Sequence, residues 1–426
     1  MSLYNEDELT APAWIDQQFI QMVLSKHEKV ENVEILNYEM SPASMKGDHY
    51  ASIMFRCKVE YRLSNAVDII KRSLILKTLP VEEDSKKREF LMDSKLFETE
   101  IKMYSETLPK FEKILAECGE PTKLCASLFY HALEPHKILI MEDLCELGYN
   151  TVRGRYLTED ELQLVYTKLA KIHAVSYMLG QSGEEQDHES VAQYQDGFMT
   201  ISTPMMKDMM SYGVKHFMDL LTSREEFAIY VDKVKVTFNE MEAACKDLFN
   251  VYKMNGDKGD DIFVLNHGDF HMRNMMFKFN TEERIEDVMM VDYQISCYAP
   301  SCIDLIYSQF MLMSPELRMQ RHRLMRFYFG EFVRILKKLN FNGKLPKYSQ
   351  FQQSTLKYRH FVMYCMGVLL PLVLGFLAKP AEDLKDVDTA KLPENPDLNA
   401  HLYLAPEVVE EVRNFMPLLL NEGYLD

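Results

Sequence analysis

The apolar pattern of this chain changes near residue 144, and the change divides the chain into two parts of different architecture. In the first part, apolar and polar residues alternate over short runs such as 33–40 and 51–63, which is typical of strands. In the second part, long amphipathic segments dominate, the first of them at 158–178. The pattern predicts a two-lobed α+β protein, with a β-rich N-terminal lobe at 1–143 and a larger, mainly helical lobe at 144–426.

The same periodicities predict the individual elements. Pro109 is expected to end a helix of the first lobe, because proline cannot continue the backbone hydrogen bonding. The acid-rich stretch at 181–197 is expected to be a surface loop, and Thr158 with Glu161 forms the pattern of a capped helix start. We expect strands at 33–40, 51–63, 73–78, 127–133, 137–141, 262–266, 275–279 and 288–292. We expect helices at 13–31, 86–111 and 158–178, over much of 204–253, and almost continuously beyond residue 302.

The charge and the cysteine content of the chain indicate which partners and which cellular compartment to expect. The chain carries 65 acidic and 48 basic residues, a formal net charge of −17, so it lacks the cationic excess with which proteins bind nucleic acid. Its 8 cysteines include no CxxC pair and are expected to be reduced, as in a cytoplasmic protein, and the N-terminus lacks the pattern of a secretory signal. The uncharged stretch at 361–378 just reaches the length of a membrane span, but Pro371 and Gly375 inside it favour a buried helix.

The strongest chemical signal lies in the segment LNHGDFHMRNMMF at 265–277. The signatures GxGxxG and GxxxxGK[ST] occur nowhere, so Rossmann and Walker-type nucleotide sites lose their support. Instead, Asp269 and Asn274 are separated by four residues, and Asp292 follows Asn274 by 18 residues. Phosphoryl transfer uses such a set: one carboxylate orients the attacking hydroxyl and accepts its proton, while an amide oxygen and a second carboxylate hold magnesium. A β-hairpin between Asn274 and Asp292 would bring the three side chains together.

Two other interpretations of this segment stay open on the residues alone. His267, Asp269 and His271 alternate, so they would lie on one face of an extended segment and could hold a metal ion for hydrolysis. That interpretation leaves Asn274 and Asp292 without a role. The segment could also be a polar turn between two buried strands, without any chemistry.

A lysine in an apolar strand of the first lobe gives an independent indication. Lys77 ends the run SLILKT, and at the inner face of a sheet its charge is costly unless it is paired. Glu100 lies on the helix that follows, so we expect a Lys77–Glu100 ion pair. The phosphates of a nucleotide require a cation that a carboxylate holds in place in this way. Taken singly, each residue could equally be a surface charge.

These features occur in the order found in the choline/ethanolamine and aminoglycoside phosphotransferase branch of the protein-kinase-like fold, which the chain resembles. More narrowly, FETEIKMYSETLPKF, LIMEDL, LAKIHAVS, HGDFHMRN, VDYQ and PSCIDLIY resemble the CHK-type, ecdysteroid-kinase-like family of arthropods. The resemblance implies a kinase that uses ATP and Mg²⁺ to phosphorylate the hydroxyl of a small molecule. It also implies roles: Asp269 as catalytic base, Asn274 and Asp292 as metal ligands, Lys77 as the phosphate-binding lysine and Glu100 as its partner.

The match covers about residues 30–340 and assigns further positions. By the same comparison, the adenine-binding hinge consists of Ile140, Met141, Glu142 and Leu144. His267 belongs to the catalytic loop, His173 is expected to be a packed histidine bonded to that loop, and Asp304 is expected to fix the loop through backbone hydrogen bonds. The sequence departs from the family in the phosphate-covering turn, where GDHYAS at 47–52 keeps a single glycine, so backbone N–H groups reach phosphates less freely.

The acceptor is expected to be an apolar alcohol of steroid-like or plant-toxin-like character, since surfaces rich in methionine suit large, irregular apolar ligands. A choline- or ethanolamine-type substrate is an alternative. A quaternary ammonium prefers a cage of aromatic faces that includes tryptophan, and the only tryptophan, Trp14, lies far upstream of the helical lobe. A non-catalytic ligand-binding protein on the same fold is a second alternative, which the glycine-poor turn favours.

Overall fold

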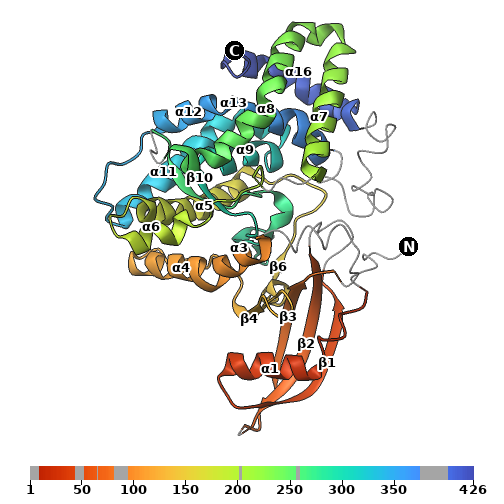
Figure 1. Ribbon diagram of the computed structural model, residues 1–426, viewed down its shortest axis with the longest axis vertical. Helices are drawn as coiled ribbons and strands as arrows, with labels where there is room; N and C mark the ends of the chain where they lie inside the picture. Colours follow the sequence, from red (N-terminus) through yellow and green to blue (C-terminus); the bar gives the residue numbers. More distant parts are fainter. Residues whose placement is uncertain are drawn as a thin grey trace.

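The computed structural model describes residues 9–43, 52–64, 66–80, 95–200, 204–255, 260–374 and 402–426. A five-stranded sheet lies at one end of the molecule and a body of helices at the other (Figure 1). The predicted fold class, a sheet-rich first lobe followed by a mainly helical lobe, is therefore confirmed.

The sheet of the first lobe is antiparallel, with the strand order β1-β2-β3-β5-β4. Helix α1 (Gln17–Glu28) covers one face of this sheet, and it begins at Asp16, whose side chain accepts a hydrogen bond from the Phe19 amide (Figure 1). It is shorter at both ends than the predicted helix. The strands span Val33–Pro42 (β1), Ile53–Leu63 (β2), Ile70–Thr78 (β3), Leu128–Ala132 (β4) and Ile138–Glu142 (β5).

The alternation along these strands decides which residues face the helical lobe. Leu76 of β3 and Ile140 of β5 pack in the core shared with α1. Ile75 and Met141 point to the opposite face and belong to the core of the helical lobe. Lys77 comes two residues after Ile75, so its side chain leaves the sheet on the face toward the helical lobe.

One long helical segment follows the sheet's third strand: α3 (Leu96–Lys102), a π-helical turn η2 (Met103–Thr107) and α4 (Leu108–Glu117). The prediction that Pro109 ends this helix is wrong. In the π turn the Leu108 N–H bonds to the Met103 carbonyl, five residues back, and Pro109 then occupies the first turn of α4, where its missing N–H is not needed. The helix therefore continues past the proline to Glu117.

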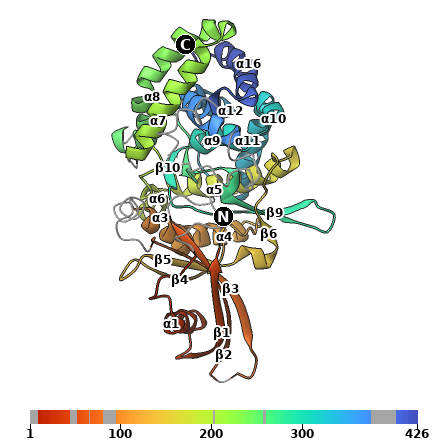
Figure 2. The ribbon, with the colours of Figure 1, turned by 90° about the vertical axis from the view of Figure 1, so that its right-hand side faces the viewer.

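Two small sheets position the predicted catalytic segment. Strand β7 (Phe263–Asn266) pairs with β10 (Cys297–Pro300), and β8 (Met275–Phe279) pairs with β9 (Ile285–Met290) and β6 (Tyr149–Asn150). The hairpin predicted between Asn274 and Asp292 is present and extends from the side of the molecule (Figure 2). The sequence does not predict β10, because a buried run of four residues has no readable period.

Helix α5 (Glu159–Gly180) begins with the predicted capping box of Thr158 and Glu161. The prediction of a loop at 181–197 is wrong in part, since this stretch contains α6 (Glu185–Ala192). Its acidic first turn, with Glu185 and Asp187, is favourable at a helix N-terminus. The other helices are α7 (Pro204–Thr222), α8 (Ala228–Asn255), α9 (Cys302–Met311), α10 (Pro315–Met319), α11 (Arg321–Lys338), α12 (Tyr348–Lys357), α13 (Arg359–Tyr364), α14 (Leu370–Leu372) and α16 (Pro406–Asn421). Short 3₁₀ turns are η3 (Leu144–Leu147), η4 (Glu225–Phe227) and η5 (Met272–Asn274).

The apolar stretch expected to be a buried helix is described as far as residue 374. It forms α13, a π turn η6 (Cys365–Leu369) and α14, and its residues from Phe361 to Pro371 are buried in the helical lobe. Among the residues that the structure describes, no helix combines the length and the hydropathy that crossing a bilayer requires.

Candidate active site

The predicted catalytic loop is a tight turn between β7 and β8. Gly268 has a φ of +86°, a conformation that residues with a Cβ rarely adopt. A Cβ at this position would lie 2.2 Å from the Ile295 carbonyl oxygen. Only glycine fits here, so the turn has one shape and presents the next residue, Asp269, in one direction.

Asp304 of α9 fixes this turn through hydrogen bonds to its backbone. Its carboxylate is fully buried and accepts hydrogen bonds from the backbone N–H groups of His267 (2.7 Å) and Gly268 (2.9 Å). The Nε2 of His173, on α5, lies 3.3 Å from the same carboxylate, and its Nδ1 lies 2.7 Å from the Tyr328 hydroxyl. His173 therefore contacts the catalytic loop through Asp304 rather than directly.

His267 uses both of its ring nitrogens within the protein. Its Nε2 lies 2.9 Å from the Val291 carbonyl oxygen, which can only accept, so Nε2 carries the proton and Nδ1 accepts from the Asp269 N–H at 3.3 Å. Burial lowers the pKa of His267, so the ring is neutral at pH 7. His267 thus ties the loop to the residue before Asp292, and no ring nitrogen is left to bind a metal ion.

Three side chains surround the Asp269 carboxylate. The Tyr307 hydroxyl donates to Oδ1 (2.9 Å), Asn274 Nδ2 donates to Oδ2 (3.0 Å), and His271 Nε2 lies 3.3 Å from Oδ2. Burial raises the pKa of Asp269, but His271 and the other hydrogen-bond donors outweigh it and hold this pKa well below its usual range. The carboxylate is therefore ionised and fixed in orientation.

The amide of Asn274 is oriented by the same carboxylate. Its Nδ2 donates to both the side-chain Oδ2 and the main-chain oxygen of Asp269, each at 3.0 Å, so the amide oxygen is the atom left to bind a cation. The Val291 N–H donates to the Asn274 carbonyl at 3.0 Å. This backbone bond places Asn274 beside the segment that carries Asp292.

Lys77 connects the two lobes at this point. Its ammonium lies 2.7 Å from the Glu100 carboxylate of α3 and 2.7 Å from the Asp292 carboxylate. The side chains of Lys77 and Glu100 are 3% and 2% exposed. The ion pair predicted between them is present, and Asp292 is a second partner that the sequence analysis does not predict.

The charges of Lys77, Glu100 and Asp292 do not cancel. Burial lowers the pKa of Lys77, but Asp292 and Glu100 outweigh it and raise this pKa above its usual range. Burial raises the pKa of Glu100 to about 7, against the opposing effect of Lys77. One ammonium thus faces two carboxylates, and the fully ionised cluster carries one negative charge in excess.

The four hinge candidates differ in where their side chains point. Met141 and Leu144 belong to the core of the helical lobe. Ile140 packs on the other face of the sheet, against α1, and the Glu142 carboxylate accepts from the Ser127 N–H at 3.3 Å. Of these four, Ile140 and Glu142 therefore direct their side chains away from the helical lobe, and the Glu142 N–H donates to the Ser127 carbonyl at 2.9 Å.

The sequence analysis assigns no role to Asp143, which lies within the predicted hinge at 140–144. Its buried carboxylate accepts from Arg56 Nε (2.6 Å), Ser73 Oγ (2.7 Å) and the Cys145 N–H (3.1 Å). Burial raises the pKa of Asp143, but its hydrogen bonds to Arg56 and Ser73 outweigh this and lower the pKa. Asp143 therefore fastens the hinge to β2 and β3, and an acid directly after the apolar strand LIME is the signal for it.

A second missed residue is Tyr307, which contacts Asp269 from α9. It lies in the motif PSCIDLIY three residues after Asp304, and residues three apart share one face of a helix. The signal was therefore present once Asp304 had been assigned.

The glycine-poor turn at 47–52 lies outside the described residues except for Ser52, so its predicted effect on nucleotide binding stays a prediction.

The donor atoms fit a magnesium ion better than a hydrolytic metal. Mg²⁺ prefers oxygen ligands and is bound in proteins by one or two carboxylates together with substrate phosphates, which suits the Asn274 amide oxygen and the Asp292 carboxylate. Within the described ranges, no group of three or more His, Cys, Asp or Glu is arranged to hold a metal ion. The hydrogen bonds made by both ring nitrogens of His267 argue against the metal-hydrolase interpretation.

A comparison of the sequence with known protein families gives the same indication as the geometry of the site. A model of the ecdysteroid kinase-like family matches residues 46–341, more than half of the chain. No curated protein matches the sequence.

Several solved structures align with the chain at low similarity. A Plasmodium vivax ethanolamine kinase is 12% identical, with 80% of this chain and 82% of that chain covered and a TM-score of 0.32. The GDP and kanamycin complex of APH(2")-IIia is 12% identical, with 92% and 100% covered and a TM-score of 0.38. A macrolide 2'-phosphotransferase from Brachybacterium faecium is 10% identical, with 84% and 92% covered and a TM-score of 0.33.

Proposed function

The chain belongs to the ecdysteroid kinase-like family and is a small-molecule kinase, and we propose that it transfers the terminal phosphoryl group of ATP to the hydroxyl of an apolar alcohol with the help of Mg²⁺. The observation that carries this proposal is the position of Lys77. Its ammonium lies within 2.7 Å of a carboxylate from each lobe, Glu100 and Asp292, although Lys77 and Asp292 are 215 residues apart in the sequence. A cation held between two lobes in this way suits the binding of phosphates.

In this proposal Asp269 acts on the acceptor alcohol. Its carboxylate is fixed by Tyr307 and Asn274, so an acceptor hydroxyl that donates to it is held in one orientation. Because its pKa is low, Asp269 is a weak base. It would accept the hydroxyl proton only as the new O–P bond forms, which suits the loose transition state of phosphoryl transfer.

Asn274, Asp292 and Lys77 would act on the phosphates. Bound magnesium neutralises the charge that develops on the transferred group. The Asn274 amide oxygen and the Asp292 carboxylate supply the oxygen ligands, and Lys77, kept in position by Glu100, supplies a positive charge. The segment from residue 140 to residue 144 would line the adenine, with the Met141 and Leu144 side chains on the face toward the helical lobe.

An apolar alcohol, such as an ecdysteroid, is a better proposal for the acceptor than choline. Trp14 stacks on His136 at a centroid distance of 4.3 Å and meets Phe19 edge-on, so it is packed in the first lobe. It is therefore not available to an ammonium cage beside Asp269.

A cytoplasmic location suits the cysteines, all eight of which are free thiols.

The test of this function compares two charge-removing variants. Asp269→Asn should lower turnover by about 10²-fold or more, because the acceptor hydroxyl loses its base. It should leave magnesium-dependent ATP binding nearly intact, because Asn274 Nδ2 keeps its hydrogen bond to the main-chain oxygen of residue 269. Asp292→Asn should weaken both, because the metal loses a ligand. Glu286→Gln, which removes an exposed carboxylate from the same hairpin, is the control and should change neither.

The measurements are ATP affinity by calorimetry, with and without magnesium, and turnover with a panel of choline, ethanolamine, sugars and ecdysteroids. Full activity of Asp269→Asn, or equal loss of ATP binding in both variants, would contradict the assigned roles. Tight binding of an ecdysteroid without any ATP consumption across the panel would instead favour a non-catalytic ligand-binding protein.

A further inference from the structure

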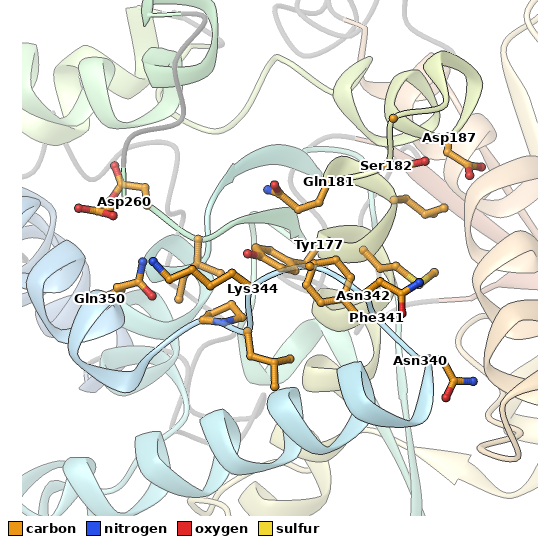
Figure 3. Close-up of a pocket in the computed structure, with 18 residues that line it drawn as sticks. Tyr177, Gln181, Ser182, Asp187, Asp260, Asn340, Phe341, Asn342, Lys344 and Gln350 are labelled. Carbon is orange, nitrogen blue, oxygen red and sulfur yellow. The ribbon is translucent and has the colours of Figure 1, made fainter.

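Figure 3 shows the residues that line a hollow on the helical lobe. Its volume is about 690 Å³, within the range of small-molecule sites. It is lined by the end of α5, the segment between α11 and α12, and the residues that lead into β7. Ile262 lines the hollow and His267 begins the catalytic turn, so the length of β7, roughly 15 Å, separates the two places. None of the residues assigned to the active site lines it.

The floor of this hollow is aromatic. Tyr177 and Phe341 meet edge-to-face at a centroid distance of 5.5 Å, and both are only partly buried against the core. Figure 3 shows Tyr177 near the middle of the hollow with Phe341 beside it. The Phe341 ring also lies across Gly343, where an added Cβ would come within 2.3 Å of it. A ring-shaped ligand can therefore rest its C–H face on these aromatic side chains.

The rim of the hollow is formed by neutral amides. Gln181, Asn340, Asn342 and Gln350 come from three different segments and lie around Tyr177 (Figure 3). An amide offers both donors and acceptors, as a hydroxyl group does. The Gln350 amide oxygen already accepts from the Lys347 N–H at 2.8 Å. A ligand with several hydroxyl groups would satisfy the remaining groups of these amides, whereas a wholly apolar ligand would cover them without partners, which is costly.

The charges of the lining cancel. Asp187 is paired with Lys110 at 2.8 Å, and Asp261 with Lys357 at 2.7 Å. Among the lining residues that the structure describes, this leaves one further acid, Asp260, and one base, Lys344. The hollow is therefore formally neutral in a protein of net charge −17, which favours an uncharged ligand over an anion or a cation.

We propose that this hollow is a second small-molecule site, one that binds a neutral polyhydroxylated ring compound, namely a sugar or a glycoside. The aromatic floor takes the C–H face of the sugar ring, and the amides of the rim bind its hydroxyl groups. The site is separate from the catalytic loop, so it does not depend on the proposed phosphotransferase activity.

The test uses the full-length protein and saturation-transfer NMR. The probes are glucose, galactose and N-acetylglucosamine, the phenyl glycosides of the three sugars, and cyclohexanol as a ring compound with one hydroxyl. We expect at least one sugar or phenyl glycoside to bind at millimolar concentration and cyclohexanol not to bind. Binding of both forms identifies the sugar ring as the recognised part, and binding of the phenyl glycosides alone identifies a glycoside.

Pocket variants locate the binding. Asn342→Ala removes one exposed amide of the rim and should weaken binding about fivefold, the effect of one hydrogen bond. Gly343→Ala should displace the Phe341 ring and weaken binding more strongly. Gln186→Ala, an exposed amide of α6 outside the hollow, should leave binding unchanged. Equal weakening in all three variants, tighter binding of cyclohexanol than of any sugar, or no binding by the whole panel would overturn the proposal.

Discussion

Replacement of Gly268 by alanine tests whether the catalytic turn has a single allowed shape. The structure predicts two separate penalties. The left-handed conformation at φ +86° costs an alanine about 1–2 kcal/mol. The added Cβ would also lie 2.2 Å from the Ile295 carbonyl oxygen, a backbone atom that cannot rotate away, and such overpacking costs about 1–3 kcal/mol. The free energy of unfolding should therefore fall by about 2–5 kcal/mol, a large part of a typical total of about 5–15 kcal/mol.

Two other glycines separate these penalties. Gly119 follows α4 with a φ of +79° and has no atom within 4 Å of its Cβ position, so Gly119→Ala should show the conformational cost alone. Gly330, inside α11, has neither a positive φ nor a neighbour, so Gly330→Ala should stabilise the protein by about 0.5–1 kcal/mol. The difference between the Gly268 and Gly119 variants then measures the overlap with the Ile295 carbonyl.

The assay is urea unfolding of the three variants beside the parent, with turnover measured for each. We expect Gly268→Ala to be the least stable and to lose most of its activity, because any backbone shift that relieves the overlap also moves Asp269. If Gly268→Ala is no less stable than Gly119→Ala, the turn adapts to a side chain, and the argument that it has a single shape is refuted.

Three further substitutions test the groups around the turn and the hinge. Asp304→Asn turns an N–H₂ toward a backbone donor and should lower the free energy of unfolding by about 3 kcal/mol, measured by urea titration, together with turnover. Arg56→Met should cost about 2 kcal/mol at pH 7. Since Arg56 helps to lower the pKa of Asp143, its contribution is fully present above the usual aspartate pKa near 4 and is lost as the pH falls through the lowered pKa of the folded state. Parent and variant should therefore converge in unfolding experiments as the pH falls below 4. Tyr307→Phe removes a donor to the Asp269 carboxylate, so the acidic limb of the turnover–pH profile should move to higher pH and kcat should fall about fivefold; an unchanged profile would contradict the contact.

The parts of the site that the sequence predicts are those built by short-range geometry. Asp269 and Asn274 share one loop, so their spacing alone brings their side chains together at 3.0 Å. The hairpin that returns the chain toward Asp292 follows from two alternating strands with a polar turn between them. The Lys77–Glu100 pair follows from the cost of a buried charge, because the nearest helix offers one carboxylate on its buried face.

The other features of the fold and of the site depend on tertiary packing, which local sequence patterns do not predict. The side-chain direction of Ile140 depends on the register between β3 and β5, where it pairs with Leu76, and this register is set by contacts across the sheet. The continuation of the helix past Pro109 depends on a π turn, which the neighbouring core stabilises and which proline rules do not predict. Asp143 accepts hydrogen bonds from Arg56 and Ser73, which lie on two other strands, 87 and 70 residues away in the sequence.

The contact between Lys77 and Asp292 places an unfavourable electrostatic cluster at the proposed functional centre. A buried lysine needs one carboxylate, and Glu100 already supplies it from the same lobe. The second carboxylate adds a repulsion that raises the pKa of Glu100, so stability alone would favour a neutral residue at position 292. Asp292 also has a φ of +65°, a conformation that is uncommon for residues other than glycine and costs further energy. A residue that is unfavourable in both charge and backbone is expected where function requires it. In the proposed function, Asp292 is therefore the partner that Lys77 would release, which would leave the carboxylate for a metal ion and the ammonium for a phosphate, while Glu100 would keep Lys77 in place.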